Sequence, residues 1–188
     1  NDGFMNLKYL YFNGNVVNAE GATLFARYLD KLNQNGEIPI KKIGIAGNTE
    51  ALVIIFHKLK EYNPPIEEVS LEGTRVDLKG SEALISYIKE ATTVKVLDLS
   101  YSSTDAEVLQ IIVQALAEND RQAPCLKLNG LSLVTNNLII VATGFLYADL
   151  DRWKALEFGS NGWGRIEMNF LMSMAWRMNN IKEVDVSG

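Results

Sequence analysis

Apolar and polar residues recur along the chain in one repeated order. Three apolar residues and one polar residue are separated by two, one and two intervening residues, as in Leu7, Leu10, Phe12 and Asn15. The copies begin at Leu7, Ile40, Ile66, Val94, Leu128, Trp153 and Ile181, and the last is incomplete. Self-similarity at such a period is typical of solenoid proteins.

Each copy predicts one short strand and one helix. Alternation of the second and third apolar residues predicts a strand with one buried face. Apolar residues three and four apart then predict an amphipathic helix, as in Leu52, Ile55 and Leu59. We predict that Ser81 caps the third helix and that Thr104, with Glu107 in a capping box, begins the fourth. The prolines fall between a helix and the next strand, at Pro39, Pro64, Pro65 and Pro124.

The repeat resembles the leucine-rich repeat, and its length resembles the ribonuclease-inhibitor-like subclass. Two copies carry Thr74 and Ser102 where the family has Asn, and both can still hydrogen-bond to backbone. The resemblance implies an α/β solenoid of six repeats plus a terminal strand, with a parallel sheet on the concave face and helices on the convex face. We expect residues 1–188 to form one domain and to be a piece of a longer solenoid.

Two intervals between copies are longer than the rest. They predict surface insertions at Asn33–Ile38 and Asn119–Lys127, both before a strand. In the last predicted helix, Met168, Met172 and Trp176 recur every four residues, and we expect them to seat a neighbouring helix.

Charge and cysteine usage exclude several classes. The chain has 18 basic and 23 acidic residues, a net charge of −5 that disfavours nucleic acid and anionic membranes. No apolar run approaches the roughly 18 residues that a membrane-spanning helix needs. The single cysteine excludes an internal disulfide and favours a reducing compartment, so we predict a cytoplasmic protein.

Catalytic chemistry has few candidate residues. The only histidine, His57, lies on the polar side of a predicted helix, and Cys125 has no base near it in the repeat order. Gly159, Gly162 and Gly164 follow a strand as a phosphate-binding loop would, but other copies have glycine in the same place. We therefore interpret the glycines as the repeat's own turn. We predict no enzyme activity, no metal, no cofactor and no small-molecule substrate.

Two further pairs of residues have structural interpretations. Asp149 and Asp151 lie in a predicted turn, and we expect them to be solvated. Trp153 and Trp163 fill apolar positions of the repeat, so we expect both in the core.

The concave face is the predicted site for a partner protein. The third, fifth and seventh positions of each copy face away from the core because strand side chains alternate. The candidate residues are Tyr9, Tyr11, Lys42, Glu68, Glu72, Asp98, Ser100, Ser132, Glu157 and Asp185. Lysine occupies the second position of most copies, at Lys8, Lys41, Lys95, Lys154 and Lys182, with Glu67 and Asn129 as the exceptions. The alternative is that the lysines only provide solubility and pair with acids on neighbouring strands.

The function that this resemblance implies is protein–protein interaction without catalysis. A second hypothesis is regulation of a small GTPase or of actin assembly, because similar repeats occur in a GTPase-activating protein and in the tropomodulin family. A third is that the chain is the targeting arm of an enzyme whose catalytic domain lies beyond either end.

Overall fold

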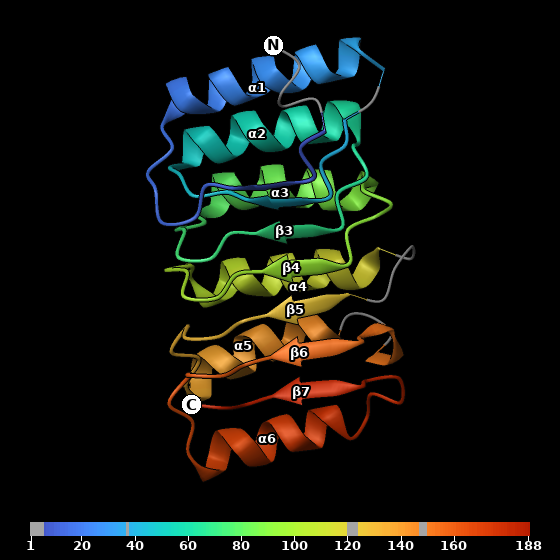
Figure 1. Cartoon of the computed structure of the whole chain (residues 1–188). Coiled ribbons are helices and arrows are strands. Elements are labelled where there is room, and N and C mark those ends of the chain that lie inside the picture. The colour runs from blue at the N-terminus through green and yellow to red at the C-terminus, as the bar shows by residue number, and fades with distance from the viewer. Residues whose placement is uncertain (1–5, 37, 120–123, 147–149) are drawn as a thin grey trace.

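The computed structural model describes residues 6–36, 38–119, 124–146 and 150–188. Within them, strands and helices alternate along the chain (Figure 1). The elements are β1 (Tyr9–Tyr11), α1 (Ala19–Gln34), β2 (Lys42–Gly44), α2 (Thr49–Tyr62), β3 (Glu68–Ser70), α3 (Leu78–Glu90), β4 (Val96–Asp98), α4 (Ala106–Glu118), β5 (Cys125–Lys127), α5 (Thr135–Leu146), the 3-10 turn η1 (Leu150–Arg152), β6 (Ala155–Glu157), α6 (Arg165–Ala175) and β7 (Glu183–Asp185).

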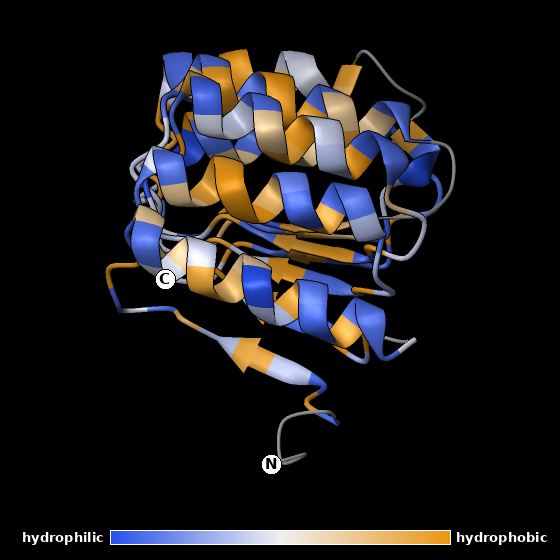
Figure 2. Ribbon diagram, turned by 90° about the horizontal axis from the view of Figure 1, so that it is seen from above, coloured by the Kyte–Doolittle hydropathy of each residue, from blue (hydrophilic) through white to orange (hydrophobic). Residues whose placement is uncertain are grey.

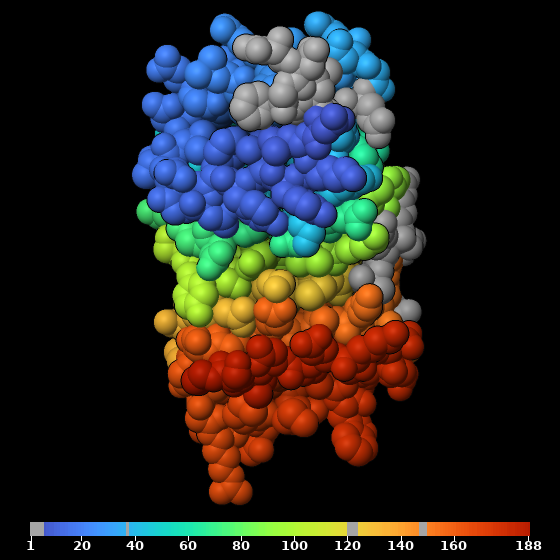
Figure 3. All heavy atoms as spheres, in the orientation of Figure 1, coloured from blue at the N-terminus to red at the C-terminus, as the bar shows by residue number. Residues whose placement is uncertain are grey.

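The strands form one parallel sheet in chain order, β1 to β7. Each is three residues long and pairs in register with the next, so that Leu10, Ile43 and Val69 stand side by side. The helices lie on one side of the sheet, and the view from above shows helices and strands as two layers (Figure 2). Successive repeats form successive bands of the surface (Figure 3). The predicted leucine-rich repeat solenoid is confirmed.

The core lies between the sheet and the helices. The central residue of each strand from β2 to β6 is buried, and the helices contribute residues such as Leu52 and Ile55. Near the C-terminal end, the ring centres of Phe145 and Trp153 lie 4.7 Å apart, and both side chains are buried. Trp163 is half-buried and packs against the core, so both tryptophans lie where the repeat predicts.

The predicted register of the fifth repeat is wrong. Strand β5 is Cys125–Lys127, and Leu126 pairs with Leu97, whereas the sequence pattern placed Leu131 in that position. Leu126, Leu128, Leu131 and Leu133 form an apolar series that fits the repeat in two frames. Pairing with β4 selects the earlier frame, so Asn136 lies in α5 instead of the turn. The second insertion is shorter than predicted, and residues 120–123 lie outside the described residues.

The predicted caps of α3 and α4 are also wrong. Helix α3 begins after Asp77, whose carboxylate accepts from the N–H of Gly80 at 2.9 Å. Ser81 lies inside the helix, where its hydroxyl donates to the carbonyl of Leu78. Helix α4 begins after Asp105, one residue later than Thr104. Acidic residues near helix N-termini are favoured by the helix dipole, and here they also mark the boundary.

Asn161 fills the polar position of the sixth repeat as predicted. It is 5% exposed, and its amide nitrogen donates to the carbonyls of Leu128 and Phe158 at 2.9 and 2.7 Å. Its oxygen accepts from the N–H groups of Leu131 and Leu133. One side chain therefore satisfies buried backbone groups of two successive repeats.

The same position differs in earlier repeats. In the third, the Thr74 hydroxyl donates to the carbonyl of Ile45 at 3.0 Å, so threonine replaces Asn as predicted. In the second, Asn48 instead caps α2, accepting from the N–H of Ala51. The connection between β2 and α2 is too short to hold both a buried polar residue and a separate cap.

Candidate protein-binding face

The concave face is the side of the sheet that the helices leave uncovered (Figure 1). Strands contribute seven of the predicted residues, and Glu72 and Ser100 follow two residues after β3 and β4. The strand residues are Tyr9, Tyr11, Lys42, Glu68, Asp98, Glu157 and Asp185. The largest exposed side chains among them are Tyr9 and Tyr11, at 57% and 52%.

Ser132 does not belong to this set of strand positions. It lies in the connection between β5 and α5, with a left-handed φ of 53°. The correct register puts Cys125 and Lys127 of β5, followed by Asn129, on the face instead. Two signals in the sequence could have located them: Pro124 directly before the strand, and the more even strand spacing that this frame produces.

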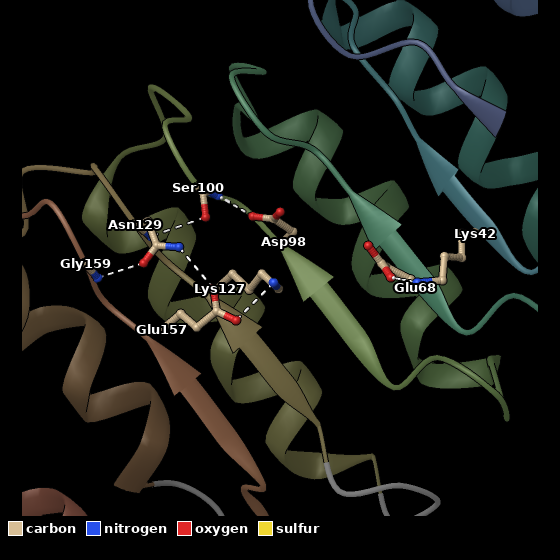
Figure 4. A network of polar contacts seen from close by, with 8 residues as sticks. All are labelled: Lys42, Glu68, Asp98, Ser100, Lys127, Asn129, Glu157 and Gly159. Carbon is tan, nitrogen blue, oxygen red and sulfur yellow. Dashed lines mark hydrogen bonds and ion pairs between the residues drawn. The ribbon is translucent and has the colours of Figure 1, made fainter. Parts of the chain in front are cut away.

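Polar contacts link the middle of the face into one network (Figure 4). The ammonium of Lys127 lies 3.0 Å from a carboxylate oxygen of Glu157. Asn129 donates to the other oxygen of Glu157 at 3.2 Å and accepts from the N–H of Gly159 at 2.7 Å. Its own N–H donates to the Ser100 hydroxyl. This part of the face is therefore held in one arrangement by its own side chains.

The N-terminal part of the face is aromatic and less linked. Lys42 pairs with Glu68 at 2.7 Å, and this hydrogen bond raises the pKa of the lysine. The Lys42 ammonium also lies 6.0 Å from the centre of the Tyr9 ring. A Cβ on Gly44 would lie 1.8 Å from the amide oxygen of Asn13 and 2.6 Å from a ring carbon of Tyr11. Glycine at this position therefore leaves room for both side chains to lie against the sheet.

Lysine–acid pairing across strands occurs on this side of the sheet, as the alternative interpretation predicts. Besides the two pairs above, Lys95 pairs with Glu67 at 2.7 Å, which lowers the pKa of the carboxylate. Glu72 and Asp98 form no ion pair within the part of the chain described here. The Asp98 carboxylate accepts from the N–H of Ser100 at 2.9 Å and lies opposite Lys127 in the strand register, where its charge helps to raise the pKa of that lysine. The face thus has one exposed acid, Glu72, that forms no ion pair with the described residues and has no lysine opposite it.

The residues considered for catalysis occupy separate and ordinary environments. His57 is exposed on α2. Burial, then the nearby Glu157, raises the pKa of the Cys125 thiol and disfavours the reactive thiolate. Asp151 accepts from the N–H of Asn179, and Asp149 lies outside the described residues. No cluster of three or more metal-ligating side chains occurs among the residues described.

The glycine-rich turn of the sixth repeat is occupied by the protein's own groups. Asn161 fills the turn, and the Glu167 carboxylate accepts from the N–H of Gly164 at 3.1 Å and from the Thr135 hydroxyl at 2.6 Å. A phosphate group would have to displace this carboxylate at the N-terminus of α6. The interpretation as a structural turn therefore agrees with the geometry.

Comparison with known proteins gives a fold likeness only. No family model matches the chain, and no curated protein matches it. Among solved structures, the chain is similar to the tropomodulin C-terminal domain of Caenorhabditis elegans, with a TM-score of 0.59 and 12% identity over 81% of this chain and 92% of that one. Within the described residues, no helix has both the length and the apolar character needed to cross a bilayer.

Proposed function

We propose that the chain is a non-catalytic module that binds a partner protein through its concave face. The observation that carries the proposal is the uncovered sheet face, which extends over all seven strands and exposes Tyr9 and Tyr11. Tyrosine side chains provide rigid contact area with few rotamers to restrict, and charges such as Asp98 add selectivity. The strand spacing of 26 to 33 residues supports assignment to the ribonuclease-inhibitor-like subclass.

The polar network also favours binding. A face that keeps Lys127, Asn129 and Glu157 in fixed positions loses little side-chain entropy when a partner docks. A partner would meet an ordered central region beside an aromatic N-terminal region.

The test compares two triple variants of equal net charge change. The concave variant carries Tyr9→Glu, Tyr11→Glu and Asp185→Lys, which leave the central network intact. The convex control carries Thr23→Glu, Glu82→Lys and Ile111→Glu, at exposed helix positions. Both are checked by circular dichroism before use.

Affinity capture from lysate, followed by titration of the purified partner, measures the outcome. We expect one protein to bind the wild type and the convex control but to bind the concave variant at least about tenfold more weakly. Equal binding by all three proteins would contradict the concave-face assignment.

The alternative is regulation of a small GTPase or of actin assembly. The fold likeness to a tropomodulin domain is its basis, and at 12% identity it concerns the backbone. Purified chain that changes the rate of actin polymerisation, with the concave variant inactive, would favour the alternative over a general binding role.

A further inference from the structure

One turn of the solenoid has an unexpected residue. After the strand, repeats pass through a left-handed backbone position, with φ of 75° at Gly14, 70° at Gly73 and 65° at Gly130. Ser160 occupies it in the sixth repeat, with φ of 57°. In the fourth repeat the residue is Tyr101, with φ of 56°. A left-handed conformation is unfavourable for any residue with a Cβ, and a bulky aromatic rarely adopts it.

The Tyr101 side chain is exposed but held in place. It is 54% exposed, and two of its ring carbons lie 2.3 Å from where a Cβ on Gly130 would be. The ring therefore rests directly on the backbone of the next repeat. The N–H of Tyr101 donates to the carbonyl of Asn129 at 2.7 Å, which fixes the turn. The ring is thus presented to solvent in one orientation.

This arrangement does not favour stability. Glycine would adopt the same φ without strain, and a half-exposed ring gains only part of the free energy of burial. Strained residues that the surrounding fold keeps in place are typical of binding sites. Rigid, partly exposed tyrosines are also frequent energetic centres of protein interfaces.

A carboxylate without an ion pair among the described residues lies on the turn next to this one. The N–H of Gly73 donates to the carbonyl of Ser100 at 2.9 Å, so the turn carrying Glu72 lies beside the turn carrying Tyr101. Glu72 is exposed and forms no ion pair among the described side chains, whereas Asp98, three residues before Tyr101, lies opposite Lys127 in the sheet. An exposed aromatic ring with a carboxylate on the adjacent turn is complementary to a guanidinium group, which can stack on the ring and pair with the acid.

We propose that Tyr101 anchors a basic segment of the partner protein, with an arginine stacked on its ring and Glu72 as its counter-charge. The proposal rests on the proposed function, because the segment would belong to the protein that occupies the concave face. To the proposed function it adds an anchor residue at the edge of the face and a positive charge on the partner segment.

The test uses fluorescein-labelled hexa-arginine as the probe, with hexa-lysine and hexa-glutamate for comparison, measured by fluorescence anisotropy at low ionic strength. We expect the wild type to bind hexa-arginine more tightly than hexa-lysine and not to bind hexa-glutamate. Tyr101→Gly should weaken hexa-arginine binding about three- to fivefold, since it removes the ring. It should also raise the thermal midpoint by about 2–4 °C, since it relieves the strain.

Three further variants complete the test. Tyr101→Phe keeps the ring and the strain, so it should bind as the wild type does. Glu20→Gln removes one exposed charge on α1 and should change hexa-arginine binding less than Glu72→Gln does.

Unchanged hexa-arginine binding by Tyr101→Gly, or equal binding of hexa-arginine and hexa-glutamate by the wild type, would overturn the proposal. The concave variant described above keeps Tyr101, Glu72 and Asp98, so failure of the general concave-face assignment would be seen in partner capture with that variant. Failure of the Tyr101 proposal would be seen in the peptide titration.

Discussion

The two sides of the sheet differ sharply in the residue types that they accept. In β4, Leu97 faces the helices and is 1% exposed, whereas its neighbour Asp98 lies on the concave face. The helix-facing residue is apolar in every described strand, because it packs against the same apolar position of each neighbouring strand. The concave residues include Tyr, Gly, Ser, Asp, Lys and Glu at one position of the repeat. Stacking therefore constrains one side of the sheet and leaves the residues of the other side free to vary.

The strongest test of this difference exchanges the chemistry of two adjacent residues. Leu97→Asp places a charge where no polar group can reach it, and we expect a loss of more than about 4 kcal/mol in the free energy of unfolding. That loss is comparable with the whole stability of many domains. Asp98→Lys should lower it by no more than about 2 kcal/mol, because the half-buried side chain lies on the uncovered face and the change only removes the hydrogen bond from Ser100 and sets a second cation opposite Lys127. Urea denaturation followed by circular dichroism measures both. Similar destabilisation by the two substitutions would mean that the sheet faces are assigned the wrong way round.

A buried polar residue qualifies the comparison. Asn161 is on the buried side of the turn, and its side chain makes the hydrogen bonds that close two repeats. Asn161→Ala should cost about 2–4 kcal/mol, since it leaves several buried backbone groups unsatisfied. Asn15→Ala, at the equivalent but exposed position of the first repeat, is the control and should cost less than about 1 kcal/mol. Equal losses in the free energy of unfolding would show that the contribution of this polar residue does not depend on its burial.

The sequence pattern predicts the buried side of the molecule much better than the turns. Order and type of strands and helices follow from the apolar periodicity, because each repeat buries its apolar residues only by stacking. The register fails in the fifth repeat, where Leu126 to Leu133 satisfy the pattern in two frames. Only pairing with β4, a contact between distant residues, distinguishes them.

The concave face inherits that error. Ser132 was expected on it, and Lys127 and Asn129, which hold its central network, were not. Tyr101 was not predicted as a site residue either, since the left-handed backbone at its position is established by the structure. Glycine at the same position of the first and third repeats, Gly14 and Gly73, is the sequence signal that could have identified it.

A charged residue on the helix side provides a test by pH. The hydroxyl and N–H of Thr135, together with the N–H of Gly164, lower the pKa of Glu167 from 4.5 to about 2. Because the folded pKa is depressed, the carboxylate stabilises the fold above pH 4.5, and this contribution is lost as the pH falls towards 2. The stability difference between wild type and Glu167→Gln should therefore be largest at neutral pH and shrink over that range. Urea denaturation midpoints of both proteins, measured from neutral pH towards pH 2, check this expectation. Glu82→Gln, on the exposed side of α3, should parallel the wild type.

The smallest expected effect concerns a polar atom in the core. The Tyr87 ring is fully buried and stacks 5.9 Å from Phe56, yet its hydroxyl has no hydrogen-bond partner among the described residues. Burial raises the pKa of this phenol, so it stays neutral and still loses its contact with water. Tyr87→Phe should therefore raise the free energy of unfolding by about 1 kcal/mol. Tyr62→Phe is the matched control and should lower it, because the Tyr62 hydroxyl donates to Asp30 at 2.5 Å and joins α2 to α1. If Tyr87→Phe is destabilising as well, the hydroxyl has a partner, and the helix side of the sheet admits polar groups more readily than its apolar pattern indicates.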